Sequence, residues 1–347
     1  MNPTSDAGML AVDGCLGEGG GQILRTSLSL SAITGRSFRI TDIRKHRSRP
    51  GLMSQHLTCV QAAAALCNAE VSGDFKGSTD LEFHPGLIRG GNFSFDIQTA
   101  GSALLVFQTL FPILSMAAEE SELELTGGTH NPHAPPFEFI DKIFLPAVAE
   151  LGFRADMELV RYGFFPRGGG IVKSRIYPRA GEADLDLTIR GRLRTVRTTV
   201  LIADLSEDIA QREARILGRE LKRSSLPAEV VHLPQGQGPG NAILLHARYS
   251  GMDSLFSSPG RKGKRAEAVA RDVVAAWRAF HQLEVPVQPE LADQLLLPMA
   301  MAGAGAFLTG PLTPHALTHL SIIGQFMGPC FKVTQEKAGR TLVEFRK

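Results

Sequence analysis

The chain has 347 residues, with 37 lysine and arginine residues against 35 aspartate and glutamate residues. This length suits one large domain or two. The near balance of charge excludes an overall positive field for nucleic acid, so any anion site must come from a local cluster.

The cysteines and the N-terminus bear on the compartment. Cys15, Cys59, Cys67 and Cys330 show no C-x-x-C spacing, which argues against a zinc ribbon or a disulfide framework and favours a reducing environment. The first residues do not form a signal peptide, and no apolar run reaches about 18 residues. We therefore expect a cytoplasmic protein without a membrane span.

Strand patterns and helix patterns alternate along the chain. Alternating apolar and polar residues predict half-buried strands at 37–43, 121–127 and 341–346. Helical patterns occupy 22–35, 53–68, 103–118, 138–152 and 292–305. Glycine pairs or triplets at 19–21, 90–91, 127–128 and 168–170 fall near the junctions and suggest repeated units, although they have no fixed period. The fold class is therefore α+β or α/β.

The pattern of predicted strands and helices changes near Asp184. Residues 185–205 supply strands, 212–224 a helix, and 228–234 and 241–249 two further strands. The basic, glycine-rich stretch 257–268 then leads into a helix that ends near Leu283. We predict a smaller inserted α/β domain at 188–283, with 1–187 and 284–347 forming the large domain.

The glycine-rich stretch GEGGGQ, residues 17–22, follows the strand-like segment 9–14. It is not a Walker A loop, because no G-K-[ST] follows, and Gln22 stands where a dinucleotide fingerprint needs its third glycine. Such a turn is most often only structural. However, bare N–H groups at a helix N-terminus can bind phosphate, and Glu18 and Arg25 could hold a metal and neutralise charge.

A second candidate anion site is the basic loop before residue 50. Four arginine and lysine side chains lie within six residues there: Arg44, Lys45, Arg47 and Arg49. The loop ends at Pro50 and Gly51 and leads into a helix that carries Gln55 and His56. A solvated surface loop and a phosphate site are both consistent with this pattern, since arginine's planar fork suits phosphoryl oxygens.

Two further stretches place polar groups in unusual settings. His130 and His133 lie in a proline-rich segment, 127–139, without a third ligand at a usual spacing, so we predict a shaped loop rather than a metal site. Gln108 lies in a strongly apolar helix, and a buried amide needs partners. The hydrogen-bonding edge of a nucleobase is one candidate partner.

His315 and His319 lie one helical turn apart in the apolar segment 312–326. On their own they fit a metal pair and buried core groups equally well. The chain has no K-x-D-G lysine nucleophile and no H-x-H-x-H triad. Histidine is therefore the candidate if a covalent nucleotide forms, because neutral imidazole can attack phosphorus near pH 7.

The helix that carries these histidines has a predictable start and a predictable apolar face. We expect it to begin at Pro314, since proline is favoured at the first helical position. We expect four apolar side chains to anchor it in the core: Leu317, Leu320, Ile323 and Phe326.

Eight segments together resemble, in order, the motifs of RNA 3'-terminal phosphate cyclases. They are 13–35, 49–63, 99–109, 127–136, 163–170, 234–241, 291–307 and 314–326. The resemblance covers essentially the whole chain. It implies three repeated units, each of two helices on a four-stranded sheet, related to the units of enolpyruvyl transferases, plus a smaller inserted domain.

The same resemblance implies an activity. Enzymes of this family convert an RNA 3'-phosphate into a 2',3'-cyclic phosphodiester at the expense of ATP and a divalent cation such as Mg²⁺ or Mn²⁺. RNA 3'-phosphate ends and ATP are therefore the expected partners, and an oligomer is possible.

The resemblance also implies residue roles. His315 matches the histidine that becomes nucleotidylated. The triphosphate and metal positions match Glu18, Arg25, Arg44, Gln55 and His56, with Glu18 as the metal ligand. The adenosine positions match Gln108, Pro135, Glu290, Leu291, Ala292, Asp293 and Gln294. Two positions depart from the family pattern: His319 replaces a polar residue such as asparagine, and Glu290 replaces what is often an aromatic residue.

Two alternative functions are consistent with parts of the sequence. HLTC (56–59) and HLSI (319–322) fit the H-x-[ST]-x signature of phosphodiesterases that open 2',3'-cyclic phosphates. A non-catalytic, cyclase-like scaffold of ribosome assembly is the other alternative. The presence of His315 argues against the scaffold, and the long separation of the two H-x-[ST]-x segments argues against the phosphodiesterase.

Overall fold

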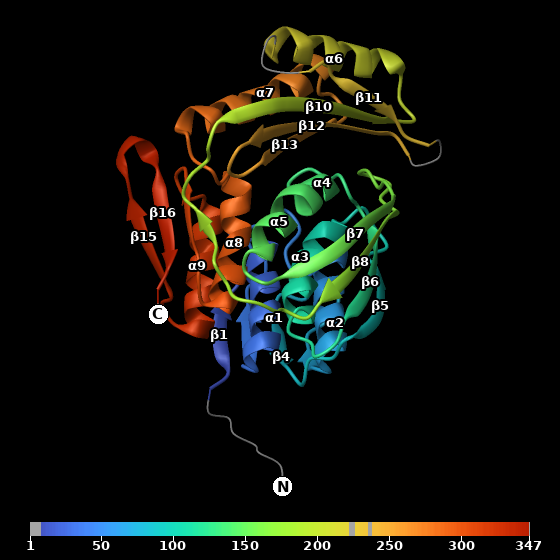
Figure 1. The fold of residues 1–347 in the computed structure, drawn as a ribbon. Coiled ribbons are helices and arrows are strands. Elements are labelled where there is room, and N and C mark those ends of the chain that lie inside the picture. The colour runs from blue at the N-terminus through green and yellow to red at the C-terminus, as the bar shows by residue number, and fades with distance from the viewer. Residues whose placement is uncertain (1–7, 222–225, 235–237, 347) are drawn as a thin grey trace.

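The computed structural model describes residues 8–221, 226–234 and 238–346. It is a mixed α+β fold with four four-stranded sheets, which confirms the predicted fold class (Figure 1). The end of the predicted helix 212–224 and part of the motif at 234–241 lie outside the described residues. Within the described part, no helix is both long enough and apolar enough to cross a membrane.

Three of the sheets belong to units with two helical segments each. The first unit contains β1 (Leu10–Asp13), α1 (Gly21–Thr34), β2 (Phe38–Thr41), α2 (Ser54–Cys67), β3 (Glu70–Ser72) and β4 (Leu81–His84). The second contains β5 (Gly91–Asp96), α3 (Ala103–Leu114), β6 (Ser121–Gly127), the helical segment α4–η1–α5 (137–149), β7 (Arg154–Arg161) and β8 (Gly170–Tyr177). The third contains β9 (Asp186–Leu187), α8 (Pro289–Ala302), β14 (Ala306–Thr309), α9 (Pro314–Met327), β15 (Phe331–Gln335), a short 3-10 turn (Lys337–Gly339) and β16 (Thr341–Phe345).

The three units share one connectivity. In each sheet the first strand runs parallel to the second, the second is antiparallel to the fourth, and the fourth is antiparallel to the third. A parallel neighbour requires a crossover, which the first helix of each unit supplies. The number of repeats implied by the resemblance is therefore present. In each unit the two helical segments follow the first and second strands in the chain, at the carboxyl edge where α/β folds commonly bind ligands.

Helix α9 begins at Pro314, as predicted from the sequence. The hydroxyl of Thr313 accepts a hydrogen bond from the N–H of Ala316, and Pro314 has no N–H of its own to leave unpaired. Ile323 and Phe326 are buried, as expected. The prediction for Leu317 was wrong, because its side chain is 54% exposed. At about 100° per residue, Leu317 lies on a different face of the helix from Ile323 and Phe326, outside the apolar stripe that they form.

The single helix predicted at 138–152 is interrupted. The segment divides into a short α-helical turn, α4 (Phe137–Phe139), a π-helical turn, η1 (Ile140–Phe144), and α5 (Leu145–Ala149). Pro146 lacks the N–H that would bond to the carbonyl four residues earlier, so the regular α-helical ladder cannot continue through it. The wider turn at 140–144 lies on the N-terminal side of this missing bond.

The fourth sheet lies between β9 and α8 in the sequence. It consists of β10 (Leu193–Ala203), β11 (Glu229–His232), β12 (Gly240–Tyr249) and β13 (Ser254–Pro259), in the order β11-β10-β12-β13. Helices α6 (Glu207–Leu221) and α7 (Ala266–Leu283) lie together on one side of this sheet (Figure 1). We propose 188–283 as the inserted domain on this basis, and 1–187 with 284–347 as the large domain.

The inserted sheet is buried on both faces. Val200 and Ile202 of β10 pack in one apolar cluster with α6 and α7, whereas their neighbours Leu201 and Ala203 pack in the core of the large domain. Successive side chains of a strand point to opposite faces, so a continuous apolar run is what such a position requires. The inserted sheet therefore packs against the rest of the protein through one of its faces.

A single buried amide connects this sheet to the third unit. Gln288, which precedes α8, is 2% exposed. Its side chain accepts a hydrogen bond from the N–H of Leu255 at 2.9 Å and donates to the carbonyl of Leu255 at 3.0 Å. Because β13 is an edge strand, the amide satisfies backbone groups that have no neighbouring strand.

We predict that Gln288→Ala lowers the free energy of unfolding by about 2–4 kcal/mol. The substitution leaves the N–H and the carbonyl of Leu255 without partners in a buried setting, and each such group costs about 1–3 kcal/mol. Denaturant unfolding of this variant, compared with Gln282→Ala at an exposed position of α7, measures the effect. Equal midpoints for the two variants would contradict the prediction.

Candidate active site

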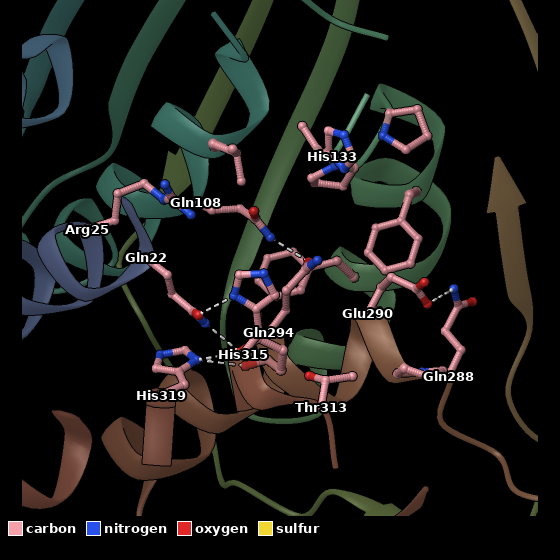
Figure 2. Close-up of a pocket in the computed structure, with 18 of the residues that line it drawn as sticks. Gln22, Arg25, Gln108, His133, Gln288, Glu290, Gln294, Thr313, His315 and His319 are labelled. Atoms are coloured by element: carbon pink, nitrogen blue, oxygen red, sulfur yellow. Dashed lines mark hydrogen bonds and ion pairs between the residues drawn. The ribbon is translucent and has the colours of Figure 1, made fainter. Parts of the chain in front are cut away.

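A cavity of about 520 Å³ lies where the three units meet the inserted sheet (Figure 2). Helices α1, α3, α8 and α9, the loop 131–136 and the edge strand β13 all contribute to its wall. The polar side chains in this wall include Gln22, Arg25, Gln108, Asp293, Gln294, His315 and His319. Side chains from distant parts of the sequence therefore face one space.

His315 stands in the first turn of α9 and is half exposed. Its Nδ1 lies 2.9 Å from Oε1 of Gln22, and its Nε2 lies 2.9 Å from Oε2 of Glu18. Figure 2 shows the rings of His315 and His319 beside Gln22. The nucleophile predicted from the sequence is thus held between two residues of the glycine-rich motif.

The orientation of Gln22 decides which nitrogen of His315 carries a hydrogen. The Nε2 of Gln22 donates to Oδ1 of Asp293 at 2.6 Å, so its Oε1 is the atom that faces His315. That oxygen can only accept, and Nδ1 of His315 must therefore donate. Nε2, the atom that contacts Glu18, is left as the ring nitrogen that can give up its proton and then offer a lone pair.

Asp293 is the centre of this network. Asp293 contacts Gln22 and also His319. Nδ1 of His319 lies 2.9 Å from the backbone oxygen of Asp293 and 3.1 Å from its carboxylate. Burial acts to raise the pKa of Asp293, but the hydrogen bonds from His319 and Gln22 outweigh it, and the pKa is lowered. Asp293 therefore stays ionised and acts as an acceptor for side chains of α1 and α9.

His319 is 7% exposed, and its Nδ1 is hydrogen-bonded to Asp293. Its Nε2 is buried and has no hydrogen-bond partner among the described residues. Of the two readings that the sequence left open, a metal pair and buried core groups, the structure agrees with the second for His319, which is buried in the wall of the site. Its contact with Asp293 shows how it helps to hold α8 against α9.

Arg25 and His56 lie beside the glycine-rich turn. A side chain at Gly21 would place its Cβ 2.2 Å from Nε2 of His56 and 3.0 Å from a guanidinium nitrogen of Arg25. At Gly17, a Cβ would lie 2.1 Å from the hydroxyl of Thr318 in α9. The glycines therefore allow the turn to approach α2 and α9 closely, a steric requirement that the sequence alone did not reveal.

The two side chains beside Gly21 have unusual ionisation. Burial, followed by the nearby charges of Arg25 and Arg44, lowers the pKa of His56 to about 3. Burial also lowers the pKa of Arg25, against the raising effect of Asp293. The guanidinium of Arg25 makes no hydrogen bond with any described residue, although it faces the cavity. It is thus a charge available to a bound anion.

Some basic side chains of the loop before residue 50 form hydrogen bonds within the loop itself. One nitrogen of Arg44 donates to the carbonyls of Arg49 and Gly51, both at 2.8 Å. Burial and the neighbouring Arg47 lower the pKa of Arg44. Arg47 donates to the carbonyl of Glu18 and lies 3.9 Å from its carboxylate. The loop therefore packs against the glycine-rich turn, and its Arg44 and Arg47 lie outside the cavity wall.

Gln55 connects two units instead of facing the cavity. Its side-chain oxygen accepts a hydrogen bond from the N–H of Ser102 at 2.7 Å, at the N-terminus of α3. Ser102 in turn caps that helix, because its hydroxyl accepts from the N–H of Leu105. In this arrangement Gln55 fixes the start of α3 beside the phosphate-binding candidates.

The far end of the cavity carries the predicted adenosine positions. Gln108 donates a hydrogen bond to Gln294, so its amide has a partner within the wall. Pro135 and Glu290 also line the cavity, and a carboxylate oxygen of Glu290 accepts from Gln288 at 3.0 Å. Leu291 and Ala292 are buried in the core and do not line the cavity.

The loop 131–136 is held by a buried histidine. His130 lies 2.8 Å from the carboxylate of Glu138 through Nε2 and 2.9 Å from the hydroxyl of Thr129 through Nδ1. Burial acts to raise the pKa of Glu138, but the contact with His130 outweighs it and lowers the pKa. This geometry agrees with a shaped loop, and within the described residues no group of three His, Cys, Asp or Glu side chains could hold a metal.

Comparison with known proteins agrees with the geometry. The family model for RNA 3'-terminal phosphate cyclase matches residues 16–333. The chain is 43% identical over 338 residues to an RNA 3'-terminal phosphate cyclase of Ectopseudomonas mendocina (strain ymp), covering 97% of this chain and 98% of the relative. It is 41% identical over 331 residues to one of Salmonella agona (strain SL483), covering 95% and 96%.

The chain belongs to the RNA 3'-terminal phosphate cyclase family. It is therefore an enzyme of the cyclase family, and the resemblance seen in the sequence is confirmed over nearly its whole length. The cyclase motifs at 13–35, 99–109, 127–136, 291–307 and 314–326 all supply residues to the one cavity.

One residue in the cyclase site was missed by reasoning from sequence. Gln22 was noted only for breaking a dinucleotide fingerprint, yet it bridges His315 and Asp293. The available signal was its position, since it is a polar residue at the start of a helix directly after a glycine-rich turn. Its partners lie more than 270 residues away in sequence, so only the fold identifies them.

We predict that His56 makes the protein sensitive to mild acid. With a pKa of about 3 in the folded state against 6.5 when unfolded, only the unfolded chain binds the proton between these values. The contribution of His56 is fully present above pH 6.5 and is lost as the pH falls toward 3. Urea unfolding of wild type and His56→Gln at pH 7 and pH 5 should show a smaller loss of stability for the variant, and a parallel loss in both would contradict this.

Proposed function

We propose that this protein converts an RNA 3'-terminal phosphate into a 2',3'-cyclic phosphodiester, using ATP and a covalent histidine–AMP intermediate. The observation that carries the proposal is the setting of His315. It stands at a helix N-terminus, has one ring nitrogen fixed by Gln22, and faces a cavity that also holds the unpaired cation of Arg25. The names and identities of the relatives support the same activity.

The first step is attack of Nε2 of His315 on the α-phosphorus of ATP, which releases pyrophosphate. Nδ1 keeps its hydrogen, which it donates to Gln22, so Nε2 is the nitrogen that supplies the lone pair. In its contact with Glu18, Nε2 donates to a carboxylate, so its proton must first pass to Glu18, and the carboxyl group must then move away to leave the lone pair free. Arg25 and the N–H groups at the start of α9 offset the charge on the phosphate oxygens.

Glu18 suits a shared metal site. Magnesium is usually held by one or two carboxylates together with substrate phosphates and waters, rather than by a complete protein cage. Glu18 is partly exposed at the edge of the site, whereas Asp293 is already committed to Gln22 and His319. A divalent cation on Glu18 would supply charge neutralisation for the triphosphate.

The cavity is large enough for a nucleotide, since small-molecule sites usually measure about 300–1,000 Å³. Gln108, Pro135, Glu290, Asp293 and Gln294 are proposed as its adenosine positions, together with Leu291 and Ala292 as the buried backbone that supports them. Gln55, His56 and Arg44 are proposed to shape the triphosphate end.

The remaining steps transfer AMP from His315 to the RNA 3'-phosphate and then close the ring. The new phosphoanhydride makes the 3'-phosphorus electrophilic, with AMP as the leaving group. The neighbouring 2'-hydroxyl attacks that phosphorus, loses its proton and expels AMP. Both groups belong to one ribose, so proximity favours the closure.

The alternatives have less support. In the phosphodiesterase reading, His56 and His319 would both act directly on the substrate. However, Nε2 of His319 is buried, and a pKa of about 3 leaves His56 without a proton to donate near pH 7. A non-catalytic scaffold would not need the network that fixes His315. A cytoplasmic location is proposed from the composition alone.

We predict that the protein incorporates label from α-labelled ATP in the presence of a divalent metal, and that His315→Ala abolishes this. The phosphoramidate bond to histidine should be labile to acid and stable to alkali after denaturation. His319→Ala keeps Nε2 of His315 and serves as the comparison. The proposal fails if wild type takes up no label, or if His315→Ala takes up as much as wild type.

We also predict that Gln22→Leu slows labelling by tenfold or more while ATP binding weakens much less. The variant removes the acceptor that holds the hydrogen on Nδ1 of His315, so both tautomers become accessible and the ring can rotate. Single-turnover labelling at several ATP concentrations separates the rate from the affinity. Gln211→Leu, at an exposed position of α6, is the matched control. A change confined to ATP affinity would refute the role assigned to Gln22.

A further inference from the structure

The turn between β7 and β8 presents an exposed aromatic ring. Phe164 is buried, with its ring 5.5 Å from that of His130, whereas Phe165 is 66% exposed. The N–H of Gly168 closes the turn by donating to the carbonyl of Phe164 at 2.7 Å. Phe165, Pro166 and Arg167 therefore form an exposed tip on a fixed base.

The tip also carries positive charge. The guanidinium of Arg167 makes no hydrogen bond or ion pair with any described residue. Its aliphatic stem packs against the inserted domain, because a Cβ at Gly238 would lie 2.7 Å from Cδ of Arg167. Figure 1 shows β7 and β8 rising toward the inserted sheet, so the tip stands where the large and inserted domains meet.

Two successive contacts connect this tip to the wall of the cavity. A Cβ at Gly168 would lie 2.7 Å from Cα of Ala100. The carbonyl of Ala100 accepts a hydrogen bond from the side chain of Asn131 at 2.6 Å, and Asn131 lines the cavity. The tip thus adjoins the site through closely packed backbone.

An exposed aromatic ring next to an unpaired arginine suits single-stranded nucleic acid. Bases stack on the ring, the guanidinium contacts the phosphate backbone, and neither interaction requires a particular sequence. The proposed substrate enters the cavity only by its terminal ribose and phosphate, so the preceding nucleotides must pass over the surrounding surface.

We propose that the Phe165–Arg167 tip binds the RNA strand a few nucleotides upstream of its 3'-phosphate, with Phe165 stacking on a base and Arg167 contacting a phosphate. This inference rests on the proposed function. It assigns the tip a part in substrate affinity and none in the formation of the histidine adduct.

The test compares 3'-phosphorylated substrates of two lengths. Under the proposal, a dinucleotide occupies the cavity without covering the tip, whereas an oligonucleotide of about ten residues extends over it. Wild type should have a lower KM for the longer substrate. Phe165→Ala should raise the KM for the longer substrate about tenfold, toward that of the dinucleotide, and leave the dinucleotide KM as in wild type. Phe165→Trp should restore the advantage of the longer substrate.

Phe75→Ala is the matched control, because Phe75 is 64% exposed and lies on a loop of the first unit. It should preserve the length dependence. Arg167→Ala should weaken binding of the longer RNA and make its affinity less dependent on salt, with a slope reduced by about one. Labelling with ATP alone tests the proposed function separately, since no RNA takes part in it.

Three outcomes would overturn the inference. One is a length dependence in Phe165→Ala equal to that of wild type. Another is an equal rise in KM for both substrates, which would indicate a structural role of the turn. The third is a change in oligomeric state with an unchanged KM, which would assign the exposed ring to contact with a second copy of the chain.

Discussion

The carboxylate of Asp293 is the constraint on which the rest of the site depends. It stands on α8, accepts a hydrogen bond from Gln22 of α1 and contacts His319 of α9. Its charge therefore joins helices of the first and third units and, through Gln22, sets the orientation of His315. A neutral or shorter residue there would leave Gln22 free to rotate, and the donor and acceptor ends of its amide could exchange. The position of the carboxylate in the fold thus makes Nδ1 of His315 the nitrogen that donates to Gln22.

The place of the insertion explains why the cavity has a fourth wall. In the first two units, the link from the first strand to the first helix is short and leads into a helix that lines the cavity. In the third unit the same link holds the whole inserted sheet, between β9 and α8. Its edge strand β13 is bound by Gln288 at the start of α8. An insertion at the opposite ends of the strands would have left the cavity open on this side.

Much of the fold could be predicted from local pattern, while the site required long-range packing. The strands at 37–43, 121–127 and 341–346 and the start of α9 followed from alternation and from Pro314, because those signals are local. The break in 138–152 and the exposure of Leu317 did not, since they depend on a missing hydrogen bond and on which helix face meets the core. His315 was reached through the family resemblance. Gln22 was not, because its role exists only once α1, α8 and α9 are packed together.

The sequence left the glycine-rich turn open between a structural role and phosphate binding, and the packing of the turn establishes the structural role. Gly17 and Gly19 have φ angles of +58° and +56°, which glycine adopts without strain, and they flank Glu18. Gly17 also packs against Thr318 of α9, so the backbone of the turn cannot shift easily. The carboxylate of Glu18 can therefore leave Nε2 of His315 mainly by rotation of its side chain. In this arrangement the turn sets the position of Glu18 beside His315, while Gly21 leaves room for His56 and Arg25.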